Sequence, residues 1–179
     1  RHTRLLTVTG VQTCALPISG RQAEEPLADS VRGALSAAIA NPAPPVPRFE
    51  RMEDRLAFLR WKGAAGERLK RRISEFQTRA DFLDTLWYES KRAGLEPTLV
   101  LGLVQVESGF RKYAVSVAGA RGYMQVMPFW ARLIGDGDPA KLFNMQVNLR
   151  FGCVILRHYL DRRSEEHTSE LQSQSTISY

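Results

Sequence analysis

The sequence predicts a mainly α-helical protein built around one domain. Apolar residues recur at helical spacing from Phe49 onward, and the alternation typical of β-strands is scarce. Prolines and glycines stand where helices would begin and end. The chain has 179 residues, of which 44% are hydrophobic, so it is long enough to bury a core. Its longest apolar run is too short to predict a transmembrane helix.

Charge and cysteine content narrow the class of protein without selecting a function. The 25 Lys and Arg residues outnumber the 19 Asp and Glu, and a net charge of +6 favours acidic partners: nucleic acid, anionic lipid or an acidic polymer. Two cysteines are too few for a disulfide scaffold or a four-cysteine zinc site. His158 has no ligand-type neighbours at suitable spacing, so we expect neither a metal site nor a cofactor.

The two ends of the chain resemble translated sequencing adapter. One codon choice for residues 163–179 gives, on the complementary strand in a shifted frame, the amino-acid run from Thr3 to Ile18. Two unrelated natural ends would not encode each other in this way. We therefore expect residues 1–19 and 163–179 to be non-biological, and the natural sequence to be truncated at both ends.

Between these ends the composition divides the chain into a linker and a domain. Residues 20–48 are expected to be an Ala/Pro-rich linker with at most a weak helix in its first part. The four prolines between Asn41 and Pro47 exclude a helix or a central strand there. The domain is expected over residues 49–162, with its motifs in residues 80–160.

The first half of the domain is expected to contain three helical stretches. The first is amphipathic and is interrupted at Gly63 and Gly66; its apolar residues at helical spacing are Met52, Leu56 and Leu59. The second carries Leu69, Ile73 and Phe76. The third begins near Thr78 and Asp81, which resemble a capping box. Its apolar face consists of Phe82, Leu83, Leu86 and Trp87, and it ends at Gly94.

Further helices are expected after Pro97 and Pro128, each suited to a first helical turn. The run from Leu99 to Val106 is apolar nearly all round, which predicts a central, buried helix. A stop is expected at Gly135, and the last helix is expected from about Met145 to Leu160. The inward positions of this last helix are Val147, Phe151, Val154, Ile155 and Tyr159, with Cys153 a core thiol.

Glu107 stands out because it follows directly on the buried helical run. Burial and the negative end of a helix dipole both raise the pKa of a carboxyl group. A glutamate held protonated near neutral pH is suited to act as a general acid in glycosidic cleavage. Ser108 and Gly109 would let the chain leave the helix sharply and open a cleft. The alternative is a helix-end glutamate that reaches solvent or pairs with Arg111 or Lys112.

A second cluster lies between Gly119 and Pro128. Its two glycines, Gly119 and Gly122, let the backbone approach a ligand or another helix closely. Gln125 offers an amide suited to sugar hydroxyls or an N-acetyl group. An apolar platform for a sugar ring is formed by Tyr123, Met124 and Met127. Taken alone, the cluster is more typical of a tight turn packed with methionine.

Together these residues resemble the lytic transglycosylase (SLT) domain, glycoside hydrolase family 23, which is related in fold to goose-type lysozyme. The resemblance rests on three ordered blocks: Glu107-Ser108-Gly109-Phe110; then Ser116-x-x-Gly119-Ala120-x-Gly122-Tyr123-Met124-Gln125-x-Met127-Pro128; then Asn148-Leu149-x-x-Gly152.

The resemblance implies a lysozyme-like helical domain that acts on peptidoglycan. Such enzymes cleave the β-1,4 bond between N-acetylmuramic acid and N-acetylglucosamine and leave a 1,6-anhydromuramic end. It further implies that Glu107 is the catalytic acid and base, with Ser108 close to the site. Ser116, Gln125 and Met127 would line the substrate cleft, and Gly122, Tyr123 and Met124 would belong to the same wall. Asn148 matches a position that we expect to be structural.

The sequence departs from the family pattern in three places. Tyr123 stands where the family often has Leu, and Ile155 where it often has Tyr. A Tyr-Asn block that the family carries after this last helix is not reached before Arg163. We therefore expect the domain to be incomplete at its C-terminal side and the chain as written to be weakly active or inactive.

Two other functions remain open at this point. A hydrolytic, lysozyme-type muramidase would leave a reducing muramic acid, and a non-catalytic peptidoglycan-binding domain would not depend on Glu107. A nucleic-acid partner is not expected, because the basic cluster at residues 68–72 lacks a recognised reader motif. The family implies the periplasm or cell envelope, with membrane association only through an N-terminal signal or anchor that is not present in this chain.

Overall fold

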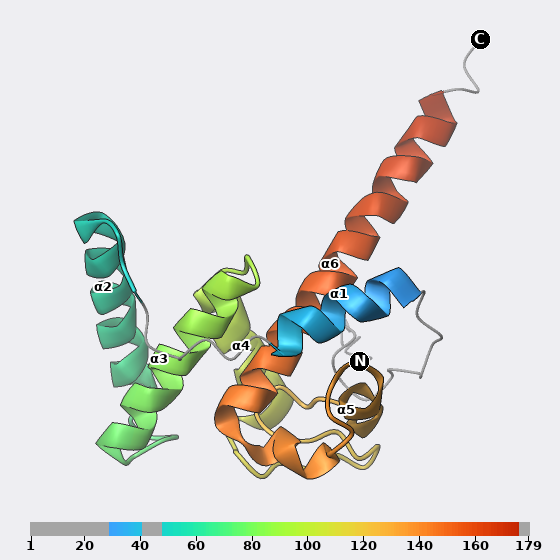
Figure 1. Ribbon diagram of the computed structural model, residues 1–179. Helices are drawn as coiled ribbons and strands as arrows, with labels where there is room; N and C mark the ends of the chain where they lie inside the picture. Colours follow the sequence, from blue (N-terminus) through green and yellow to red (C-terminus); the bar gives the residue numbers. More distant parts are fainter. Residues whose placement is uncertain (1–28, 41–47, 176–179) are drawn as a thin grey trace, which may run out of the picture.

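In the computed structural model, residues 29–40 and 48–175 are described, with side chains described as far as Glu165. Within these residues the chain forms six α-helices and one 3-10 helix, and the only β-type pairing is two isolated bridges. Figure 1 shows the long helix α6 running through the body of the molecule. The mainly α fold class is therefore confirmed. The elements are α1 (Asp29–Ala40), α2 (Met52–Leu69), α3 (Phe76–Arg92), α4 (Pro97–Ser108), α5 (Pro128–Ile134), η1 (Pro139–Phe143) and α6 (Met145–Ser175).

Helix α1 lies within the segment expected to be a linker. It contacts α5 and α6, and Leu35 is buried while Val31, Ala38 and Ile39 pack partly against the core. These residues recur at helical spacing, so they form one apolar side of α1. This side packs against α5 and α6, and the segment is therefore a helix attached to the domain. Residues 20–28 and 41–47 lie outside the described residues, as does the adapter-derived leader expected at 1–19.

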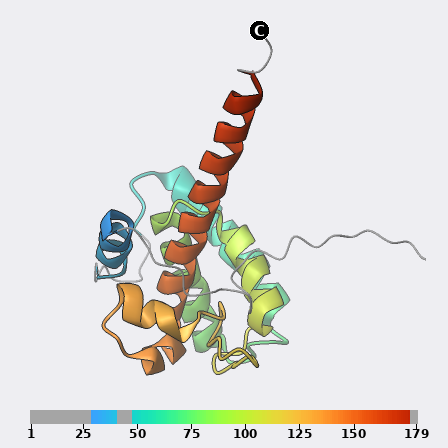
Figure 2. The same ribbon diagram turned by 90° about the vertical axis from the view of Figure 1, so that its right-hand side faces the viewer.

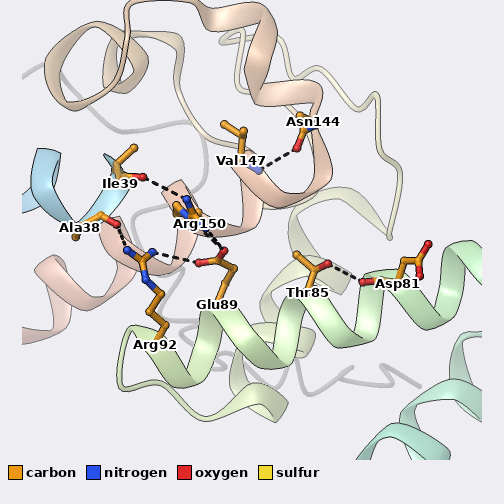
Figure 3. Close-up of polar contacts among 9 residues, drawn as sticks. All are labelled: Ala38, Ile39, Asp81, Thr85, Glu89, Arg92, Asn144, Val147 and Arg150. Atoms are coloured by element: carbon orange, nitrogen blue, oxygen red, sulfur yellow. Dashed lines mark hydrogen bonds and ion pairs between the residues drawn. The ribbon is translucent and has the colours of Figure 1, made fainter. Parts of the chain in front are cut away.

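A buried ionic network holds the C-terminal end of α1 (Figure 3). Arg92 of α3 donates to the carbonyl oxygen of Ala38, and Arg150 of α6 donates to that of Ile39. Glu89, which is 1% exposed, pairs with both arginines. Because the last carbonyls of a helix have no partners within it, the two guanidinium groups supply the missing donors.

Helix α2 runs without a break through Gly63 and Gly66, so the expected interruption is wrong. A glycine costs about 1 kcal/mol in a helix interior but does not end the helix by itself. The side of α2 that packs on α3 carries Phe58, Ala65 and Leu69, all buried. The predicted apolar residues Met52, Leu56 and Leu59 lie on the solvent side instead.

Helix α3 begins three residues earlier than predicted, with Glu75 rather than Thr78 as its N-cap. The Glu75 carboxylate accepts hydrogen bonds from the backbone amides of Thr78 and Gln77. Hydrogen bonding by the Thr78 side chain, followed by these two amide bonds, holds the pKa of Glu75 below its usual value. The predicted apolar face is confirmed, since Phe82, Leu83 and Leu86 are almost completely buried.

Helix α6 extends to Ser175, well beyond the expected end near Leu160. No glycine or proline occurs between Cys153 and Ser175, so nothing in that stretch ends the helix. Its predicted inward positions are confirmed, with Phe151, Val154 and Ile155 buried. Both views show the C-terminal part of α6 projecting from the remaining helices (Figure 2).

Two cavities lie beside α1. One of 390 Å³ is lined by residues of α1, α5, η1 and α6, and one of 430 Å³ by residues of α1, α3 and α6. Neither is lined by Glu107 or by the cluster between Gly119 and Pro128. Among the helices of residues 29–40 and 48–175, none is both long and apolar enough to cross a membrane.

Candidate active site

Helix α4 has one buried face rather than being buried all round. Val100 and Val104 are inaccessible to solvent, whereas Val106 is 81% exposed. The helix packs mainly against α3, and its opposite side faces outward. The expectation of a central helix is therefore wrong. An apolar sequence predicts burial but does not determine how many neighbouring elements pack around the helix.

Glu107 lies in the last turn of α4 and is half-buried. The helix ends at Gly109 in the left-handed conformation (φ 58°), whose amide donates to the carbonyl of Gln105 at 3.1 Å. Phe110 follows with a positive φ of 66°, so the chain turns away from the helix axis at once. The Glu107 carboxyl is thereby held at the border between core and surface, beside the negative end of the helix dipole.

Ser108 has a structural role. Its side chain is 2% exposed, and its hydroxyl donates to the carbonyl oxygen of Val104 at 3.2 Å. Its own carbonyl accepts a hydrogen bond from Nε of Arg111 at 2.9 Å. Ser108 therefore fixes the helix end that carries Glu107 rather than offering its hydroxyl to a ligand.

Ser116 organises the turn that begins the second cluster. Its amide donates to the carbonyl of Ala120 at 3.0 Å, and its hydroxyl accepts from the Ala120 amide at 3.1 Å. Gly119 closes the turn in a left-handed conformation, with φ 87°. Ser116 is half-buried, so part of its surface stays accessible.

The Gln125 side chain forms hydrogen bonds within its own loop. The residue has a positive φ of 49°, and its side-chain amide donates to the carbonyls of Gly122 and Ala114 at 2.9 and 3.2 Å. Only 4% of the residue is exposed. The side chain predicted to bind sugar hydroxyls thus already uses its donors within the protein.

Asn148 anchors this loop to α6 through three hydrogen bonds. Its Oδ1 accepts from the amide of Met124, and its Nδ2 donates to the carbonyls of Arg121 and Leu142, each at 2.8 Å. Gly122 makes the close approach possible, because a Cβ there would lie 2.7 Å from the Leu142 oxygen and closer to the Asn148 amide. Asn148 therefore acts as a structural tie.

Tyr123 and Met124 lie in the core instead of forming an open sugar platform. Met124 is fully buried, and Tyr123 is 3% exposed with its ring 4.9 Å from that of Phe82. Burial, with the nearby phenol of Tyr113, raises the pKa of Tyr123. Met127 is half-buried at the start of α5 and keeps some accessible surface.

Cys153 and His158 are the cysteine and histidine of the central part of the chain. Cys153 is completely buried, which confirms the predicted core thiol, and burial raises its pKa. Burial lowers the pKa of His158. In the part of the chain that the structure describes, no group of three His, Cys, Asp or Glu residues is placed to hold a metal ion.

The structure thus brings most of the predicted site residues into one hydrogen-bonded loop between α4 and α5, joined to α6 by Asn148. Glu107 lies on the helix that leads into this loop. Gly152 belongs to the third block of the resemblance but was given no role from the sequence; in the structure, a Cβ there would lie 2.7 Å from the Cβ of Met124. The signal for this role was its four-residue spacing from Asn148, which places both on one side of α6.

Comparison with known proteins identifies the domain. Residues 85–173, about half of the chain, match the family model of the Transglycosylase SLT domain. The match ends within the segment expected to be adapter-derived. The chain therefore carries an SLT domain, and the predicted resemblance to lytic transglycosylases is confirmed.

Similar curated proteins are described as membrane-bound lytic murein transglycosylase C. That of Actinobacillus pleuropneumoniae serotype 5b (strain L20) is 42% identical over 88 residues, 45% of this chain and 24% of its own length. That of Histophilus somni (strain 2336) is 42% identical over 79 residues, 40% of this chain and 22% of its own length.

A protein of Enterobacteria phage PRD1 described as a transglycosylase is 34% identical over 88 residues, 49% of this chain and 32% of its own length. The chain thus spans about a quarter of the length of the first of these relatives. No solved structure matches the chain.

Proposed function

We propose that the chain is part of a peptidoglycan lytic transglycosylase. It would cleave the β-1,4 bond between N-acetylmuramic acid and N-acetylglucosamine and leave a 1,6-anhydromuramic end. The SLT domain match supports this activity, as do relatives described as lytic murein transglycosylases. The observation that carries the proposal is Glu107, half-buried at the turned end of α4 within the matched region.

In this proposal one carboxyl group performs both proton transfers. Protonated Glu107 donates its proton to the departing glycosidic oxygen, and the resulting carboxylate accepts the proton of the muramic acid 6-hydroxyl as the anhydro ring closes. The usual glycosidase uses a second carboxylate. Here the next acidic residue along the chain is Asp136, which pairs with Lys141 and whose pKa is lowered by that contact.

The remaining predicted site residues divide into two groups. Ser116 and Met127 keep accessible surface, so we propose that they contact the glycan directly. Gly122, Tyr123, Met124 and Gln125 are buried, and we propose that they hold the wall of the cleft in shape from behind. Ser108 and Asn148 then position the helix end and the loop, respectively.

We also propose that the protein acts in the cell envelope, where peptidoglycan lies. The description of the bacterial relatives as membrane-bound murein enzymes supports this location. The net charge of +6 suits an anionic wall polymer. The periplasm is the specific compartment that we propose.

The test is release of muropeptides from purified sacculi by the chain and by its Glu107→Gln variant, with products identified by mass spectrometry. Prolonged incubation with excess protein makes slow turnover measurable. We expect anhydro-ended products from the unaltered chain, at least about 100-fold less from Glu107→Gln, and retained binding of sacculi by both. Glu96→Gln is the matched control, since Glu96 flanks the other end of α4 and is exposed.

The alternatives give different results in the same assay. Products with reducing muramic acid ends would indicate a hydrolytic muramidase. Binding without any product, unchanged in Glu107→Gln, would indicate a non-catalytic peptidoglycan-binding domain. Equal product release by the unaltered chain and Glu107→Gln would contradict the role assigned to Glu107.

A further inference from the structure

Helix α2 carries an apolar stripe that no other described part of the chain covers. Met52, Leu56 and Leu59 are 65%, 45% and 50% exposed. Their spacing of four and three residues places them on one side of the helix. Side chains of this kind are ordinarily buried, and three of them aligned in solvent indicate a contact surface.

The opposite side of α2 is fixed against α3. The rings of Phe58 and Trp61 lie 5.2 and 5.1 Å from that of Trp87, and Lys62 forms an ion pair of 2.5 Å with Asp84. Among the described elements, α2 has substantial contacts with α3 alone. Figure 1 shows α2 at one end of the molecule, away from α5 and α6. The stripe therefore points outward from an anchored helix.

Basic side chains surround the stripe. At 100° per residue, Arg55 and Arg60 fall on its two sides, and both are exposed. Exposed Arg71 and Arg72 follow the C-terminal end of the helix. Some charge near α2 is neutralised, since Arg51 pairs with Glu53 and Asp54, and Lys70 with Glu67. The two flanking arginines remain beside the aliphatic residues.

We propose that α2 binds the surface of an anionic lipid membrane, with Met52, Leu56 and Leu59 entering the headgroup boundary. An interfacial helix combines a narrow apolar face with basic residues at its borders. The aliphatic stems of Arg55 and Arg60 lie along the apolar layer while their guanidinium groups meet lipid phosphates. This binding is independent of the activity proposed for Glu107.

Two other occupants fit the surface less well. A hydrophilic wall polymer complements the arginines but gives the three aliphatic side chains no apolar partner. In a symmetric dimer a second copy would bring the same arginines face to face, and like charges oppose association. A lipid surface satisfies the apolar stripe and the charges together.

Vesicle co-sedimentation tests this proposal. The full chain is mixed with phosphatidylcholine vesicles that either lack or contain about 30% of the anionic lipid phosphatidylglycerol, which attracts basic segments. We expect binding only to the anionic vesicles, weakened by added salt. The Leu56→Ser/Leu59→Ser double variant is expected to bind about tenfold more weakly, because two apolar side chains no longer leave water. Arg55→Glu is expected to weaken binding at least about fivefold.

Val106→Ser is the matched control, since Val106 is an even more exposed aliphatic residue on another helix. It is expected to bind vesicles like the unaltered chain, and circular dichroism checks that each variant keeps its helices. The proposal is overturned if the unaltered chain does not bind anionic vesicles, or if the double variant binds as well as the Val106 control. It is also overturned if the double variant loses self-association or sacculus binding while vesicle binding is unchanged.

Discussion

Arg150 of α6 donates two hydrogen bonds to a single oxygen of Glu89 in α3, from Nε at 3.1 Å and from Nη2 at 2.9 Å. Glu89 is 1% exposed, so this ion pair joins two core helices and is largely shielded from water. Arg92 pairs with the other oxygen of Glu89, and both arginines reach the carbonyls at the end of α1. The pair thus joins three segments that are far apart in sequence.

Replacing Glu89 by Gln should strongly destabilise the domain, because the variant leaves the Arg150 charge buried without its partner. Breaking a buried pair in this way costs about 3–5 kcal/mol. Urea unfolding followed by circular dichroism measures the change. Glu96→Gln, which removes an exposed pair with Lys91, is the control and should change the free energy of unfolding by less than about 1 kcal/mol. Similar losses for both variants would contradict this account.

Gly152→Ala should destabilise the domain because the added Cβ would overlap Met124, whose Cβ would lie 2.7 Å away. Overpacking of a filled core costs about 1–3 kcal/mol. Gly63→Ala is the opposite case, since nothing lies within 4 Å of its added Cβ in the interior of α2. That variant should gain about 0.5–1 kcal/mol from helix propensity. Thermal unfolding of both variants checks the contrast, which fails if they shift in the same direction.

Asn148→Leu removes the three hydrogen bonds that hold the loop carrying Gln125. The amide of Met124 and the carbonyl of Leu142 would lose this partner, at a cost of about 1–3 kcal/mol, whereas the Arg121 carbonyl keeps its hydrogen bond from the Val126 amide. Hydrogen exchange should be faster for the Met124 amide than in the unaltered chain. If this loop forms the wall of the substrate cleft, as proposed above, release of muropeptides should also fall. Unchanged protection of Met124 would argue against Asn148 as its partner in solution.

The Cys153 thiol should resist modification in the folded protein, because burial raises its pKa and excludes the reagent. In a Cys14→Ser variant, which leaves one thiol, Ellman's reagent at pH 8 should react only after denaturation. Since the folded-state pKa lies above the unfolded value, this thiol contributes stability below about pH 8.5 that is lost as the pH rises further. Rapid reaction under native conditions would contradict the burial of Cys153.

The motifs around Glu107, Ser116 and Asn148 were readable from the sequence because their spacing is local. Capping chemistry and periodicity likewise located α4, α5 and the start of α6, since prolines and glycines act on the backbone at the position where they stand. The end of α6 was placed too early, near Leu160, because the apolar pattern stops there. The helix continues to Ser175 because no glycine or proline occurs between Cys153 and Ser175 to end it.

What the sequence could not decide is which side of each helix meets a neighbour. The apolar pattern of α2 and α4 did not predict which of their apolar residues face solvent, namely Met52, Leu56, Leu59 and Val106. Nor did periodicity indicate that Tyr123, Met124 and Gln125 are buried, or that Glu89 pairs with Arg150. Periodicity gives the shape of one helix, whereas burial and pairing depend on contacts between residues distant in the chain, which only the tertiary structure supplies. The family was thus determined by residues close in sequence, and the structural role of each residue by residues close in space.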